Sequence, residues 1–238
     1  MDAGRRGREA LKLVICTPTI KRPFDAYLAA LEAEVPLLDA AGFEHFAVNE
    51  VGSAYISHAR SSMLRKAMDV QPDVVVFIDH DMSWEPGELV KLVQTPGDVV
   101  CGTYRFKTEK VEYMGTWRTD AEGYPEQRED GCIRGEWVPA GFLKVTSHAV
   151  NEMMKAYPEL NYGPLYRLSH DLFNHGAFEG VWYGEDYAFS RRWNARGGEI
   201  WINPRLELTH HGADGTAYSG SFHNYLRRQP GGDLAEAA

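Results

Sequence analysis

Five consecutive apolar residues, Val74–Ile78, form the most distinctive hydrophobic run in the chain. The run is mostly β-branched or aromatic and too short for a typical helix, so it predicts a strand buried on both faces, as in a parallel sheet covered by helices. It ends in two carboxylates one residue apart, Asp79 and Asp81. Because open α/β sheets bind ligands at the carboxyl ends of their strands, the two carboxylates mark a candidate site.

Strand-like and helix-like patterns alternate through the first hundred residues. They predict strands at 11–17, 44–49, 74–78 and 98–104 and helices at 24–41, 55–68 and 89–93. We expect a loop to open at Pro18 and Thr19, and Pro36 to kink or split the first helix. The spacing is that of right-handed βαβ units, which predicts a Rossmann-like α/β fold with a mostly parallel central sheet flanked by helices.

The pattern changes after Lys107. Residues 109–138 mix Thr, Tyr, Trp, Gly and charged residues, which indicates hairpins and loops. Helices are predicted again at 147–156, with Ser147 as N-cap, and at 186–195, and short strands at 199–202 and 206–210. We therefore expect one domain over 11–229, with flexible ends at 1–10 and 230–238.

The composition narrows the classes of function. A formal net charge of −9 argues against general attraction to nucleic acid or to an anionic membrane. No apolar run reaches the length of a membrane span and the N-terminus has no secretory signal pattern, so a soluble, cytoplasmic protein is expected. The three unevenly spaced cysteines predict buried free thiols rather than a disulfide framework.

Two carboxylates as close as Asp79 and Asp81 repel each other unless a cation joins them. Their hard oxygen ligands suit Mg²⁺ or Mn²⁺, ions that commonly share their coordination shell with a substrate's phosphates. The alternative is structural: Asp79 caps a turn, and Asp81 caps a helix that begins in residues 83–87.

A second acidic pair, Glu185 and Asp186, opens a predicted helix. Acidic residues there can simply compensate the helix dipole. Trp182 and Tyr183 precede the pair, however, and aromatic surface beside a carboxylate suits a sugar-ring site, because ring faces can stack while the carboxylate takes a hydroxyl proton.

Two histidines, His210 and His211, close the last predicted strand. Strand alternation turns their side chains to opposite faces. They are either surface histidines without a role, or one of them adds an imidazole nitrogen to a mixed oxygen and nitrogen shell for Mn²⁺ beside Asp81.

In their order and spacing these segments resemble the GT-A glycosyltransferases, in particular the large inverting group called family two. The resemblance covers about residues 11–212. The matching motifs are Thr17-Pro18-Thr19, Ser57-His58-Ala59-Arg60-Ser61, Asp79-His80-Asp81, the strand before Lys107, the segment around Gly141, Glu185-Asp186 and His210-His211-Gly212. Ser61 stands where the family usually has Asn.

The resemblance implies a GT-A fold in which 11–107 bind a nucleotide sugar and 108–229 face the acceptor. The donor would be a UDP- or GDP-sugar. The acceptor would be a glycan, a small molecule or a hydroxymethylated base in viral DNA, and these alternatives stay open. The oligomeric state is not indicated.

The resemblance also assigns roles to residues. Asp81 and His210 would ligate Mn²⁺ or Mg²⁺, with His211 as the weaker candidate. Asp186 would deprotonate the acceptor hydroxyl, with Glu185 as a weaker candidate that positions the acceptor. The residues assigned to the nucleotide sugar are Thr17, Pro18, Thr19, Asn49, Arg60, Asp79, His80, Lys107, Gly141 and Trp182.

Two other classes of protein share parts of this pattern. Metal-dependent phosphohydrolases of the haloacid dehalogenase type also carry Asp-x-Asp after a hydrophobic strand, but usually after the first strand. A non-catalytic module that binds sugar nucleotides would have no need of Asp186.

Overall fold

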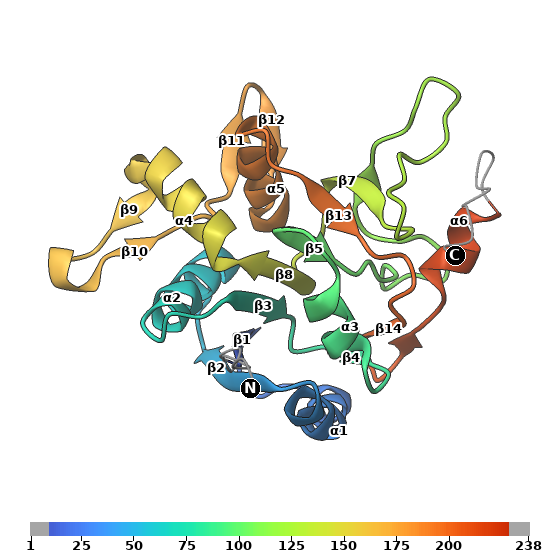
Figure 1. Cartoon of the computed structure of the whole chain (residues 1–238), viewed down its shortest axis with the longest axis horizontal. Coiled ribbons are helices and arrows are strands. Elements are labelled where there is room, and N and C mark those ends of the chain that lie inside the picture. The colour runs from blue at the N-terminus through green and yellow to red at the C-terminus, as the bar shows by residue number, and fades with distance from the viewer. Residues whose placement is uncertain (1–9, 229–238) are drawn as a thin grey trace, which may run out of the picture.

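A computed structural model, which describes residues 10–228, shows an α/β structure built on one large sheet (Figure 1). The sheet has eight strands in the order β2-β1-β3-β8-β5-β13-β7-β6. Their bounds are β1 Leu11–Thr19, β2 Phe43–Val51, β3 Val74–Ile78, β5 Val99–Cys101, β6 Thr116–Trp117, β7 Ile133–Trp137, β8 Phe142–Thr146 and β13 Ile200–Ile202. The ends expected to be flexible, 1–10 and 230–238, lie outside the described residues apart from residue 10.

Most strands of this sheet run in one direction. Strand β1 pairs in parallel with β2 and β3, and β13 pairs in parallel with β5. Strand β8 runs antiparallel to both β3 and β5 and so joins the two parallel groups, while β7 runs antiparallel to β13. The expected mostly parallel sheet is confirmed, but the strand β8 inside it was not predicted.

Helices cover both faces of the sheet. Helices α2 (Ile56–Met68), α4 (Ser147–Ala156) and α5 (Glu185–Ala195) pack on one face, and α1 (Asp25–Ala40) and α3 (Glu88–Gln94) on the other. Along β3, Val75 and Phe77 face the first group and Val74, Val76 and Ile78 face the second, and all five side chains are buried. The prediction of a strand buried on both faces is confirmed.

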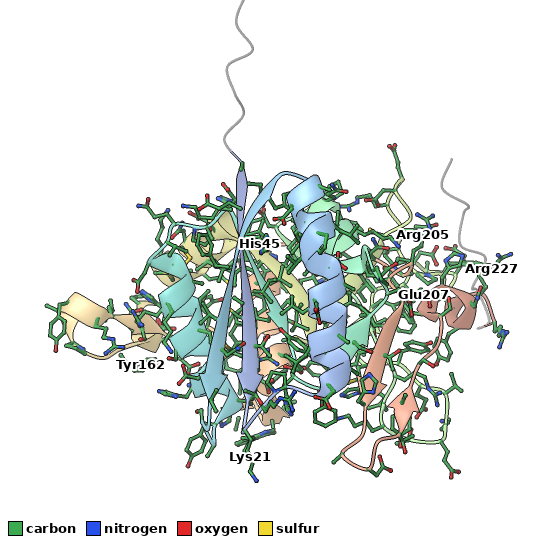
Figure 2. All side chains as sticks on the ribbon, turned by 90° about the horizontal axis from the view of Figure 1, so that it is seen from below. Lys21, His45, Tyr162, Arg205, Glu207 and Arg227 are labelled. Atoms are coloured by element: carbon green, nitrogen blue, oxygen red, sulfur yellow. The ribbon has the colours of Figure 1, made fainter. Side chains whose placement is uncertain are left out.

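Smaller elements surround the sheet. A second sheet contains β4 (Met82–Trp84), β14 (Leu208–His211) and β15 (Ala217–Tyr218), and helix α6 (Phe222–Leu226) follows it. Two hairpins are formed by β9 (Asn161–Tyr162) with β10 (Ser169–His170) and by β11 (Gly176–Phe178) with β12 (Val181–Tyr183). Short 3-10 turns at Pro158–Leu160 and Leu165–Arg167 flank β9. The β9–β10 hairpin, marked by Tyr162 in Figure 2, projects from the body of the molecule.

Three local predictions are wrong. Strand β1 continues through Pro18 to Thr19 where a loop was expected; this is possible because its pairing with β3 ends at Cys16, so the missing N–H of Pro18 is not needed there. Residues 83–87 do not begin a helix: β4 occupies their start, α3 begins at Glu88, and Asp81 caps no helix. The N-cap of α4 is Thr146, whose side chain accepts from the Ala149 N–H, and not Ser147.

The segment that follows Asp81 is fixed by a buried glutamate of α1. Glu34 is fully buried and accepts hydrogen bonds from Trp84 Nε1 at 3.2 Å, Gly87 N at 2.8 Å and Val90 N at 3.0 Å. Helix α1 stays continuous through Pro36. The turn carrying Asp79 and Asp81 is therefore held between β3 and a segment anchored to α1.

The predicted cysteine state is confirmed, because Cys16, Cys101 and Cys132 are buried and unpaired. Within residues 10–228, no helix is both long and apolar enough to cross a membrane. The strands β1 and β2 point toward the edge marked by Lys21 in Figure 2, with His45 nearer their amino ends. The candidate site lies at this carboxyl edge.

Candidate active site

The two acidic motifs meet at one buried arginine. Arg60 of α2 is 2% exposed, and its Nη2 lies 2.8 Å from Oδ1 of Asp79 while its Nε lies 3.5 Å from Oε1 of Glu185. Its Nη1 also donates to the carbonyl oxygen of Ala140 at 3.3 Å. One guanidinium thus joins the end of β3 to the start of α5, which are far apart in the sequence.

The burial of Arg60 differs from the expectation that it contacts the nucleotide. Its guanidinium carbon lies 5.7 Å from the ring centre of Phe77 and 5.6 Å from that of Phe173. A cation enclosed by aromatic rings and carboxylates interacts with groups of the protein and not with a ligand. The structure therefore makes Arg60 a support for the two acidic motifs.

Asp186 has a different environment from its neighbour. Glu185 is drawn to Arg60, whereas Oδ1 of Asp186 accepts a hydrogen bond from the Tyr187 N–H at 2.8 Å. Burial, followed by the negative charge of Glu185, raises the pKa of Asp186 from 3.8 to about 6. This carboxyl group can accept and release a proton near neutral pH.

The second carboxylate of the Asp-x-Asp motif faces a histidine and a lysine. Oδ2 of Asp81 lies 3.6 Å from Nε2 of His210 and is also in contact with Nζ of Lys107. Burial alone would raise the pKa of Asp81, but the hydrogen bonds and charges of His210 and Lys107 hold it well below its usual value. The structure therefore brings Asp81, Lys107 and His210 together.

The two histidines are turned apart. Nδ1 of His210 lies 3.0 Å from the Arg105 carbonyl oxygen, so Nδ1 carries a hydrogen, and Nε2 is the ring nitrogen that faces Asp81. Nε2 of His211 instead lies 2.7 Å from the Ser83 hydroxyl, and burial lowers the pKa of its ring. Of the two rings, His210 is the one placed to act with Asp81.

The donor atoms of Asp81 and His210 suit a divalent cation. Among residues 10–228 no three His, Cys, Asp or Glu side chains form a metal-ligand cluster, so the protein offers this pair. Their separation of 3.6 Å is close to the roughly 3 Å between neighbouring ligands of an octahedral ion. A backbone carbonyl on the far nitrogen is the usual support of a metal-binding histidine. Mg²⁺ and Mn²⁺ commonly complete such shells with water and phosphate oxygens.

A hollow of about 100 Å³ lies between the end of β1, the turn after β3 and the start of α2, and reaches His80, the neighbour of Asp81 in the chain. It is lined by Pro18, Thr19, Ile20, Ser53, Ala54, Ile56, Ala59 and His80. Three of these, Pro18, Thr19 and His80, were predicted to bind the nucleotide sugar. Ser53, Ala54 and Ile56 were missed, although their place just before and at the start of a predicted helix beside that strand could have indicated them.

Three other predicted contacts are not brought to this hollow. Thr17 is buried, and its hydroxyl lies 2.5 Å from that of Tyr27. Asn49 is exposed on β2, where it pairs with Thr17. Trp182 is 71% exposed on the β11–β12 hairpin, three residues before Glu185, and does not line the hollow.

Gly141 supports the site through its backbone. A Cβ atom there would lie 2.2 Å from the Tyr104 hydroxyl and 2.8 Å from Oδ2 of Asp79, so no side chain fits. Its carbonyl accepts from the Asp79 N–H at 3.1 Å, and its own N–H donates to the Tyr104 hydroxyl at 3.1 Å.

Tyr104 was missed by the sequence analysis. Its buried ring packs edge-on against His210, with ring centres 4.9 Å apart, while its hydroxyl bonds to Gly141. It therefore orients both halves of the site. Its position at the end of a predicted strand, where side chains meet at the carboxyl edge, was the available signal.

Comparison with known proteins gives structural similarity alone. No protein-family model matches the chain, and no curated protein is significantly similar to it. A mutant of Drosophila β1,4-galactosyltransferase 7, in complex with manganese, UDP-Gal and xylobiose, is similar with a TM-score of 0.45 and 14% identity over 92% of this chain and 74% of that one. Residues 1–349 of TarS from S. aureus are similar with a TM-score of 0.44 and 13% identity over 91% of this chain and 64% of that one. The structure of the same TarS residues in complex with UDP-GlcNAc is similar with a TM-score of 0.45 and 12% identity over 81% of this chain and 56% of that one.

Proposed function

We propose that this protein is a metal-dependent glycosyltransferase of the GT-A type, which moves a sugar from a nucleotide diphosphate sugar to an acceptor hydroxyl with inversion. One observation carries the proposal: Asp81 lies 3.6 Å from His210 and belongs to the motif that Arg60 joins to the Glu185-Asp186 pair, and the raised pKa of Asp186 suits it to take a proton. The two groups supply what transfer needs, a place for the leaving diphosphate and a base for the attacking hydroxyl.

The donor lies across the carboxyl edge. The hollow bounded by Pro18, Thr19 and His80 takes part of the nucleotide, and the diphosphate extends toward Asp81. Asp81 Oδ2 and His210 Nε2 would hold a divalent ion, and its charge would stabilise the departing diphosphate. Asp79, anchored by Arg60 and by the Gly141 carbonyl, faces the ribose.

Asp186 acts as the general base. It removes the acceptor proton as the hydroxyl oxygen bonds to the anomeric carbon from the face opposite the diphosphate. Glu185 lies beside Arg60, and its negative charge helps to raise the pKa of Asp186. Glu185 therefore tunes and positions the site instead of taking the proton.

The acceptor side favours a sugar. Trp182 exposes most of its ring just before the acidic pair, and Tyr183 stacks on Trp137 with ring centres 4.7 Å apart. Aromatic faces of this kind bind the apolar faces of sugar rings. The net charge of −9 counts against DNA as the acceptor.

The phosphohydrolase alternative fits less well. In that class the first Asp of the motif is the attacking nucleophile, but here Oδ1 of Asp79 is held by Arg60 at 2.8 Å. A carboxylate in such an ion pair is a weaker nucleophile, and the chemistry would leave Asp186 without a part.

A thermal-shift panel tests the proposal. UDP, GDP, CDP, ADP and dTDP are each added with and without Mn²⁺, and one nucleotide is expected to raise the melting temperature only when Mn²⁺ is present. At a hundred times Kd the stabilisation is about 2.7 kcal/mol, which corresponds to roughly 5–10 °C for a chain of this size. The Asp81→Asn variant is the matched control and should lose the metal-dependent part. No shift with any nucleotide would contradict the proposal.

The pH dependence of transfer follows from the raised pKa of Asp186. The protonated acid cannot accept a proton, so kcat/KM should rise with pH through about 6 and level off above it. Initial rates between pH 5 and 8 at saturating metal measure this. A rate that is constant over that range, or that falls, would argue that Asp186 is not the base.

A further inference from the structure

One oxygen of Asp81 is shared between a lysine and a histidine. Nζ of Lys107 contacts Oδ2 of Asp81, and Nε2 of His210 faces the same oxygen at 3.6 Å. The Lys107 side chain is 35% exposed and that of Asp81 is 14% exposed, so the ammonium covers the carboxylate from the solvent side. Lys107 thus stands at the position from which an incoming cation would approach.

The backbone that carries Lys107 is held in place. The Phe106 N–H donates to the Glu112 carbonyl at 3.0 Å, which closes the loop. Inside it, Nη2 of Arg105 donates to the carbonyl oxygens of Thr108 and Glu109, each at 3.2 Å. Lys107 can therefore leave Asp81 by rotating its flexible side chain, without movement of the loop.

A divalent ion and the Lys107 ammonium repel each other when both contact Asp81. Both are cations, and an ion bound between Asp81 and His210 would lie next to Nζ of Lys107 and repel it. A nucleotide diphosphate removes the conflict, because its negative oxygens can accept the ammonium while they also join the shell of the ion.

We propose that Lys107 is an exchangeable cation, which neutralises Asp81 in the free protein and passes to the diphosphate when metal and nucleotide bind together. This inference rests on the proposed function, since it takes Asp81 as a metal ligand. It adds a consequence: metal alone binds weakly, and metal and nucleotide each strengthen the binding of the other by the same factor.

The first measurement is Mn²⁺ affinity without nucleotide, from the electron paramagnetic resonance signal of free Mn²⁺. Lys107→Met removes the competing cation and is expected to bind Mn²⁺ at least tenfold more tightly than the unmodified protein. Lys107→Arg keeps a cation at Asp81 and should stay close to the unmodified protein. Lys110→Met is the matched control, because Lys110 belongs to the same loop but pairs with Glu112 and should leave the affinity unchanged.

The second measurement is the same affinity at saturating UDP, or at the nucleoside diphosphate that gives the largest thermal shift. In the unmodified protein we expect the nucleotide to increase Mn²⁺ affinity by more than tenfold. In Lys107→Met this factor should shrink to a few-fold, because the tighter metal binding is already present and the diphosphate has lost its ammonium partner.

The outcomes separate the inference from the function on which it rests. If Lys107→Met and the unmodified protein bind Mn²⁺ equally while Asp81→Asn loses it, the exchange is overturned and the metal site stands. If Lys110→Met increased Mn²⁺ affinity as much as Lys107→Met, the exchange would also be overturned, because the loss of one positive charge anywhere in the loop would then explain the effect. If none of the proteins binds Mn²⁺ with any nucleotide, the metal assignment fails together with the inference.

Discussion

Replacing Asp186 with Asn should reduce sugar transfer by roughly a thousandfold, within the usual contribution of a general base. The amide keeps the shape of the carboxyl group and can still accept from the Tyr187 N–H, but it cannot take a proton from the acceptor. Metal-dependent nucleotide binding should not change, because Asp81 and His210 are untouched. Steady-state transfer and thermal shift with Mn²⁺ and nucleotide measure the two properties separately.

Glu185→Gln is the matched variant on the adjacent residue. It keeps Asp186 ionisable, so a smaller loss of transfer is expected. Removing the charge of Glu185 also removes a cause of the raised pKa of Asp186, and the acid limb of the pH profile should move to lower pH. If the Asp186→Asn variant transferred sugar at the normal rate, the base would have to be another group. The same would follow if Glu185→Gln lost more activity than Asp186→Asn.

Replacing Arg60 with Met should destabilise the protein by about 3 kcal/mol, toward the lower end of the cost of breaking a buried ion pair. The side chain is 2% exposed, and its loss leaves Asp79 and Glu185 without their shared partner. Both carboxylates keep some contact with water, which limits the cost. Urea denaturation gives the free energy of unfolding directly.

Arg65→Met is the control on the same helix. Arg65 pairs with Asp69, which is mostly exposed, and surface pairs of this kind contribute less than about 1 kcal/mol. Arg60→Lys should recover only part of the stability, because one ammonium cannot form the fork that reaches Asp79, Glu185 and the Ala140 carbonyl. Equal unfolding free energies for Arg60→Met and Arg65→Met would contradict the role given to Arg60.

The elements of the first hundred residues could be read from the sequence because their apolar patterns are local. The run Val74–Ile78 is apolar at every position, as a strand between two helical layers must be, and in the structure its side chains are buried against helices on both faces of the sheet. A place for His210 beside Asp81 was also expected, as one of two interpretations of the histidines and from the resemblance of their motifs, and the two side chains lie 3.6 Å apart.

Other parts of the fold depended on contacts between distant segments. Strand β8 enters the sheet between β3 and β5 and pairs antiparallel with both, so its place depends on two strands that lie far from it in the sequence. The capping of α4 by Thr146 instead of Ser147 follows from the point at which β8 ends. Neither the place of β8 in the sheet nor the N-cap of α4 can be read from the hydrophobic periodicity of the residues that form them.

The amino-acid sequence was therefore sufficient for the α/β class, the carboxyl edge as the place of the site, and the acidic and histidine residues that could act there. The tertiary structure alone decided that Arg60 is buried between the acidic motifs, that Lys107 covers Asp81, and that Thr17 faces Tyr27 instead of a ligand. The reason is physical: periodicity reports which face of an element is buried, whereas the partner of a charged or polar side chain depends on which distant groups packing brings within a few ångströms of it.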